Sequence, residues 1–134
     1  MITFVIPGVC VAKGRARTLK SGRSYTPAKT ANYAARVAQI GKLAMGDEPP
    51  VEGPLSLTLV VHLPIPASWS KAKQASALNG AVWPVSRPDV DNYAKNILDA
   101  LNGIVWADDS AVVSLACTKI YSDDPRAVVR VVPV

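Results

Sequence analysis

The stretch RPDVDNYAKNILDALNG, residues 87–103, is the segment from which the fold can be worked out. Pro88 disfavours helix at Arg87 and suits the entry to a helix, so the chain should turn from extended to helical at 89–91. One apolar stripe recurs at helical spacing: Ala94, Ile97, Leu98, Leu101 and Ile104. Gly103 provides a stop. We therefore predict a helix of about three turns with one buried face, capped by Asp89 or Asp91.

Negative charge is concentrated around this helix. Five of the ten acidic residues lie between Asp89 and Asp109, although the net charge is +5. The Asp89-x-Asp91 pair stands at a strand-to-helix corner, and a third carboxylate returns at Asp108 or Asp109. Such a set suits a hard divalent cation such as Mg²⁺, which can activate water and stabilise charge on a phosphate. Lys95, one turn after Asp91 on the same flank, would add a positive charge there.

Each of these residues also has a simpler interpretation. An aspartate at a helix start is usually a cap, an Asp-Asp pair is usually a turn, and an Asp–Lys pair one turn apart is usually a surface ion pair. A calcium loop is not supported, because Tyr93 and Ala94 stand where that loop requires an oxygen ligand and a glycine.

The whole composition indicates one domain, residues 1–134, with 49% hydrophobic residues for a core. An uninterrupted apolar run of about 18 residues is lacking, and the apolar start has no basic leader, so neither a membrane span nor a signal peptide is expected. Cys10 and Cys117 lack metal-site spacing and are expected as reduced, buried thiols. His62, the single histidine, lies in an apolar run. A Ser-His-Asp or Cys-His mechanism therefore has little support.

Positive charge is concentrated near the start of the chain. Residues 1–46 contain no acidic side chain and eight basic ones: Lys13, Arg15, Arg17, Lys20, Arg23, Lys29, Arg36 and Lys42. This distribution is expected for contact with a phosphate backbone, although a solubilising basic face would have the same composition. Glycines and polar residues predict a loop or loose hairpin over 13–27. Its basic side chains would order on meeting phosphates.

The remaining patterns predict the other elements. Strands are expected at 2–6, 55–63, 111–121 and 127–132, the second of them central in a sheet. A helix is expected over 28–45, with Thr26 as its cap and Pro27 at its first position, and a short one over 68–78 with Ser68 as its cap. Together they predict an α+β, two-layer domain, with a mixed sheet of about four strands and helices mainly on one face.

Three pieces of the chain carry a resemblance to a known family. They are KGRAR at 13–17, YTPAKT at 25–30, and RPDVDN at 87–92 continuing to DALNG at 99–103 and DDSAVV at 108–113. Together they resemble the RusA family of Holliday junction resolvases, often carried by bacteriophages and prophages. The resemblance spans most of the chain and is tightest over 87–113.

The resemblance implies a homodimeric, Mg²⁺-dependent endonuclease that nicks four-way DNA junctions symmetrically during recombination and repair. It implies Mn²⁺ as a substitute metal, no nucleotide cofactor, no membrane, and a place in the cytoplasm of a bacterial host. The catalytic residues implied are Asp89, Asp91, Lys95 and Asp109, with Asp89, Asp91 and Asp109 as metal ligands, so Asp109 is favoured over Asp108. The expected DNA-binding residues are Lys13, Arg15, Arg17, Lys20, Arg23, Lys29 and Arg87.

Two other classes of function account for part of the sequence. A basic DNA-binding or architectural protein without catalysis explains the positive charge but not the clustered aspartates. A phosphotransferase or nucleotide hydrolase is disfavoured, because the N-terminal glycines do not fit a phosphate-binding loop. Paired nicks require two centres, which predicts a two-fold dimer. Trp106, beside the acidic pair, is interpreted as a core residue or as an aromatic facing an interface or DNA.

Overall fold

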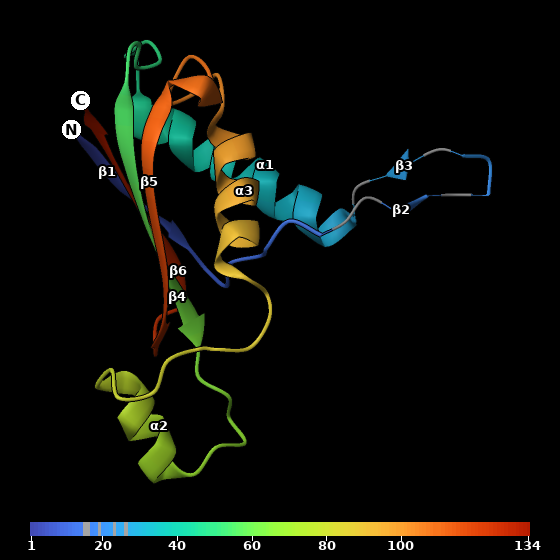
Figure 1. Cartoon of the computed structure of the whole chain (residues 1–134), viewed down its shortest axis with the longest axis vertical. Coiled ribbons are helices and arrows are strands. Elements are labelled where there is room, and N and C mark those ends of the chain that lie inside the picture. Colours follow the sequence, from blue (N-terminus) through green and yellow to red (C-terminus); the bar gives the residue numbers. More distant parts are fainter. Residues whose placement is uncertain (15–16, 19, 23, 26) are drawn as a thin grey trace.

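The computed structural model describes residues 1–14, 17–18, 20–22, 24–25 and 27–134. Its main sheet has four strands in the order β1-β6-β4-β5 (Figure 1). These strands are β1 (Ile2–Pro7), β4 (Leu55–Pro64), β5 (Val112–Ser122) and β6 (Arg126–Pro133). β6 is antiparallel to both β1 and β4, whereas β5 is parallel to β4. The prediction of a mixed sheet of about four strands is confirmed.

β4 is the central strand, as predicted, because it pairs with β6 on one side and β5 on the other. Its side chains alternate in burial: Leu55, Leu57, Leu59 and Val61 are fully buried, and those between them are half-buried or exposed. Successive side chains of a strand point to opposite faces. One face of the sheet is therefore the core and the other is largely open, which is the expected two-layer arrangement.

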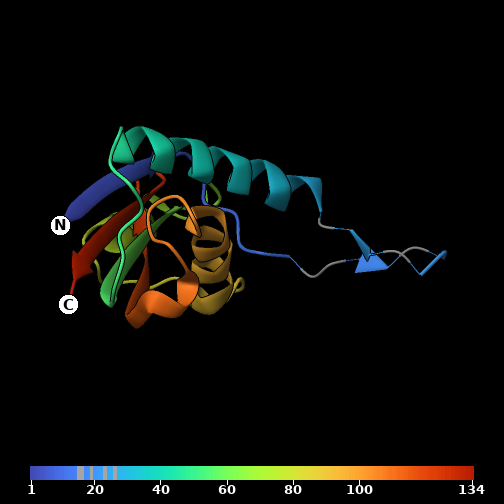
Figure 2. The same ribbon diagram turned by 90° about the horizontal axis from the view of Figure 1, so that it is seen from above.

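Two helices cover the buried face: α1 (Ala28–Met45) and α3 (Val90–Leu101). Figures 1 and 2 show α1 running across the sheet beside α3. Gly41 of α1 is buried against α3, and a Cβ on it would lie 2.5 Å from Leu101 Cδ2. A glycine is therefore what allows the two helices to approach closely. In the described part of the chain, no helix is long and apolar enough to cross a membrane.

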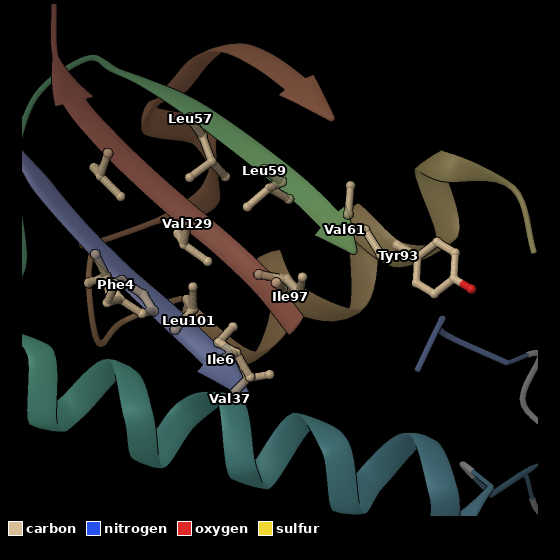
Figure 3. Packing of buried hydrophobic residues seen from close by; sticks show 14 of the residues in the cluster. Phe4, Ile6, Val37, Leu57, Leu59, Val61, Tyr93, Ile97, Leu101 and Val129 are labelled. Carbon is tan, nitrogen blue, oxygen red and sulfur yellow. The ribbon is translucent and has the colours of Figure 1, made fainter. Parts of the chain in front are cut away.

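The core joins both layers. Figure 3 shows Phe4 and Ile6 of β1, Val37 of α1 and Ile97 of α3 packed around Val129 of β6. The predicted stripe of α3 faces this core: Ala94, Ile97 and Leu101 are buried, and Leu98 and Ile104 are half-buried. The twelve residues of α3 agree with the predicted three turns.

Three predicted details are changed by the structure. α2 (Lys71–Leu78) begins after Ser70, whose Oγ accepts a hydrogen bond from Lys73 N at 3.2 Å, so the predicted start at Ser68 is wrong. α2 also lies beyond the end of the sheet and not on its helical face (Figure 1). Pro27 occupies the cap position of α1 and not its first helical position, while Thr26 lies outside the described residues.

The predicted loop or loose hairpin is present between β1 and α1. The short strands β2 (Arg17–Thr18) and β3 (Ser24–Tyr25) pair antiparallel. Figure 2 shows these two strands projecting from the domain beyond the start of α1.

Candidate active site

Asp89 and Asp91 stand at the N-terminal end of α3. Asp89 precedes the helix with extended backbone angles, φ −70° and ψ 153°, and its side chain makes no capping hydrogen bond. Asp91 is in the first turn, and both residues are exposed. The expectation that Asp89 or Asp91 caps the helix through its side chain is therefore not met at Asp89. The Asp89 carboxylate is therefore available to a ligand. The N-terminal end of a helix also stabilises the ionised form of a nearby carboxylate.

The Asp89 side of the helix opens to solvent. Arg87, Pro88, Asp89 and Asn92 line an open hollow of about 530 Å³. A larger groove of about 620 Å³ shares Arg87 and Pro88 with it and reaches Lys29 near the start of α1. Arg87 and Lys29 therefore line one continuous surface that leads to Asp89.

Lys95 lies one turn after Asp91 on α3 and is exposed. Within the described residues, the ion pairs are Lys13–Asp99 and Arg126–Asp124, so Lys95 is not paired with Asp91. The simple reading of these two residues as a surface ion pair is not supported. The ammonium of Lys95 and the carboxylate of Asp91 both remain free for a common ligand.

Asp109 is held firmly at the other end of α3. It begins the short helix η1 (Asp109–Ala111), where its backbone N donates to Asn102 Oδ1 at 3.1 Å. Its Oδ1 accepts a hydrogen bond from Trp106 Nε1 at 2.7 Å. Asp108 is exposed and makes no capping bond to η1. The two neighbouring aspartates thus differ, because only Asp109 has its orientation set by a buried group.

Trp106 explains why Asp109 is held. Its ring is fully buried in the core, which fits the core interpretation, while its indole N–H reaches the carboxylate. Neither the hydrogen bond from Trp106 nor the one that Asp109 donates to Asn102 is predicted by the sequence pattern. The positions of Trp106 and Asn102 on either side of the turn after α3 were the available signal.

The three aspartates of the predicted metal site do not meet within one chain. Asp91 lies in the first turn of α3 and Asp109 is bonded to Asn102, the residue after its last turn, so about 15 Å of helix separates them. Figure 1 shows the start of β5 at the far end of α3 from the loop that carries Asp89. Among the described residues, no three His, Cys, Asp or Glu side chains form a metal-binding group.

The predicted DNA-binding residues other than Arg87 are distributed along the N-terminal part. Lys13 pairs with Asp99, and its backbone N donates to Asn92 O at 3.0 Å, which ties this segment to α3. Lys20, Lys29 and Arg87 are exposed. Arg15 and Arg23, together with the side chain of Arg17, lie outside the described residues, so their predicted role stays a prediction.

The thiols near α3 are not suited to catalysis. Cys117 Sγ lies 3.7 Å from Val90 O, and burial raises the pKa of this thiol to about 11. Burial also raises the pKa of Cys10. Both cysteines are free thiols that stay protonated at neutral pH, and a thiolate is the form needed for attack or metal binding. His62 lies on the opposite face of the sheet from α3.

Comparison with known proteins identifies the class. Residues 7–132 match the family model described as "Endodeoxyribonuclease RusA". This family model describes endodeoxyribonucleases, which are enzymes that cleave bonds within a DNA strand. The chain belongs to the RusA family. It is also 38% identical over 135 residues to the "Uncharacterized protein YqaN" of Bacillus subtilis (strain 168), an alignment that covers 97% of this chain and 94% of that protein.

We expect Trp106→Phe to reduce DNA cleavage about tenfold, because the buried ring is largely kept while the hydrogen bond to the Asp109 carboxylate is lost. The smaller ring should also lower the free energy of unfolding by about 1–3 kcal/mol. Single-turnover cleavage well below the unfolding temperature separates these effects. Trp69→Phe is the control, because Trp69 packs edge-on against Tyr121, away from Asp109. Equal rates for the two variants would contradict the positioning role.

Proposed function

We propose that this protein is a Mg²⁺-dependent, structure-selective endonuclease that resolves four-way DNA junctions by paired symmetric nicks in recombination or repair. The observation that carries the proposal is the pair of exposed carboxylates at the start of α3, Asp89 and Asp91, in a chain of the RusA family. The Asp89 carboxylate is not used to cap the helix. Arg87 lies in the same hollow as Asp89 and supplies a cation beside it.

The donor chemistry of Asp89 and Asp91 fits a hard cation. Both are exposed carboxylates, and oxygen ligands of this kind are those preferred by Mg²⁺ and Mn²⁺. A bound ion of this type supplies an activated water and offsets charge that develops on the phosphate. Asp109 completes the proposed ligand set.

The chain's own cations would hold the DNA. The guanidinium of Arg87 can make bidentate hydrogen bonds to a backbone phosphate in the hollow. Lys95 presents an ammonium on the same flank of α3 as Asp91. Lys29 extends this contact along the neighbouring groove. Together they would place a scissile phosphate next to Asp89.

The separation of Asp109 from the other two aspartates favours a two-fold dimer. β5 is an edge strand that begins after Asp109 and passes the loop before Asp89 at Lys119. Val113 and Leu115 on this strand are 61% and 48% exposed, and an unpaired edge readily accepts another strand.

Antiparallel pairing of two β5 edges about a two-fold axis would set the start of one β5 beside the end of the other. It would bring the Asp109 of each chain toward the Asp89 and Asp91 of its partner. The dimer would then hold two equivalent centres, as paired nicks require. We propose that each centre is built from both chains.

The decisive experiment compares a labelled four-way junction with a linear duplex of the same sequence. In Mg²⁺ we expect two nicks at symmetry-related positions in the junction and an intact duplex. Removing the metal with EDTA should stop cleavage because the carboxylates alone cannot activate water, and Mn²⁺ should restore it. A protein that binds the junction but leaves it uncut in both metals would instead be the non-catalytic DNA-binding alternative.

A further inference from the structure

Two alternate side chains of β5, Cys117 and Lys119, reach the segment around the start of α3, and the next one, Tyr121, contacts the loop before α2. Cys117 Sγ lies 3.7 Å from Val90 O. Lys119 Nζ donates to Ser86 O and Pro88 O, at 2.9 Å each. The Tyr121 ring packs against Trp69 with centroids 5.2 Å apart. Because these residues are two apart on one strand, they point to the same face. β5 therefore supports the chain that leads into the candidate site.

The segment held by Lys119 has little other support. Among the described residues, the two bonds from Lys119 are the hydrogen bonds that the structure gives to 83–88. Apart from Pro84, which is buried, the segment is loosely packed: Trp83 is 57% and Val85 is 92% exposed, and 85–89 are all exposed. Its position therefore depends strongly on the Lys119 ammonium.

The two carbonyls that Lys119 holds bracket Arg87 and end one residue before Asp89. An ammonium shared by two carbonyls makes charge-assisted hydrogen bonds, which are the stronger kind. A fixed backbone on both sides of Arg87 limits where the side chains of Arg87 and Asp89 can reach. In catalysis, displacement of a group by about 1 Å can cost about 100-fold in rate.

We infer that Lys119 is a positioning residue, which holds the 86–88 backbone so that Asp89 and Arg87 meet the metal and the scissile phosphate. The inference rests on the proposed function. Lys119 acts through the loop, and its charge need not touch DNA. Lys119→Met removes both hydrogen bonds while keeping the length of the side chain, and Lys119→Arg keeps donors and charge. Lys71→Met, an exposed lysine on α2, is the matched control for loss of charge.

The first measurement is hydrogen–deuterium exchange of the free protein at the first turn of α3, where the amide of Asn92 donates to Asp89 O; it requires neither metal nor cleavage. We expect Lys119→Met to raise exchange there about tenfold, Lys119→Arg to raise it less, and Lys71→Met to leave it unchanged. Exchange in Lys119→Met equal to that of the unmodified protein would overturn the inference. If Lys119→Met does not fold, Lys119→Gln, which loses the charge and shortens the side chain, takes its place with the same expected result.

The second measurement links the loop to the site. Mn²⁺ binding to the free protein, followed by electron paramagnetic resonance, should weaken in Lys119→Met, and the Mg²⁺ concentration for half-maximal cleavage should rise about tenfold. The Kd for the junction in EDTA should change less than about twofold, and Lys119→Arg should restore part of the loss.

Two other roles of Lys119 would give different results in these measurements, and either would contradict the inference. If Lys119 contacts a phosphate directly, the variant should bind the junction more weakly, lose about one unit of salt dependence and keep its Mg²⁺ requirement. If its role is only structural, the unfolding temperature should fall while the Mg²⁺ requirement stays the same. If the unmodified protein cuts no junction, the proposed function fails, and the exchange and Mn²⁺ measurements still decide the role of Lys119.

Discussion

Asp91→Asn should abolish junction cleavage while leaving folding and junction binding nearly intact. Asp91 is exposed in the first turn of α3, so the amide has room and no buried contact is lost. A metal centre contributes several kcal/mol to the transition state, and about 1.4 kcal/mol corresponds to tenfold in rate, so we expect a loss of about 1,000-fold or more. Binding should stay equal or tighten, because one negative charge facing DNA is removed.

Single-turnover cleavage and gel-shift titration in parallel measure the two effects. Asp47→Asn is the matched control, because it removes the same charge from an exposed connector after α1. That variant should cut at the normal rate. An Asp91→Asn protein that cuts in Mg²⁺ near the normal rate would show that the proposed metal site is wrong. Loss of cleavage together with loss of junction binding would place Asp91 in DNA recognition instead.

Two inactive variants should restore cleavage when they are combined, if each centre is shared between two chains. Asp91→Asn and Asp109→Asn are each expected to be inactive alone. In a mixed dimer, one centre carries both changes, and the other has the intact Asp89 and Asp91 of one chain with the intact Asp109 of the other. Random mixing should recover about a quarter of the normal centres, since half of the dimers hold one each.

The two variants are unfolded together, refolded as a mixture and tested on a junction labelled on all strands. Because each mixed dimer has one working centre, the products should be single nicks and not resolved duplexes. Mixing Asp89→Asn with Asp91→Asn is the control. Those changes lie on the same side of the interface, so every mixed dimer has both centres damaged. If the first mixture remains inactive, the three carboxylates do not come from two chains in the way proposed.

Local sequence was sufficient for most of the elements. The boundaries of α1 follow from Pro27 at its start and Gly46 after its end, and both are properties of single residues. The alternation along β4 predicted a central strand, because burial on one face selects an apolar residue at every second position. The start of α2 was predicted two residues early, since Ser68 and Ser70 are both good caps and only the backbone distinguishes them.

In the candidate site, too, some residues are placed by local sequence and others only by the tertiary structure. Asp91 and Lys95 lie one turn apart in α3 and Asp89 directly precedes it, so local geometry alone places the three residues close together. The distance of Asp109 from these three residues depends on the direction in which α3 runs and on the turn that returns to β5. The bonds of Lys119 to Ser86 and Pro88 join positions about 30 residues apart through strand pairing and helix packing. Local propensity therefore determined the helix and its charged end, whereas tertiary packing decided which charges meet, because contacts between distant residues exist only once the chain has folded.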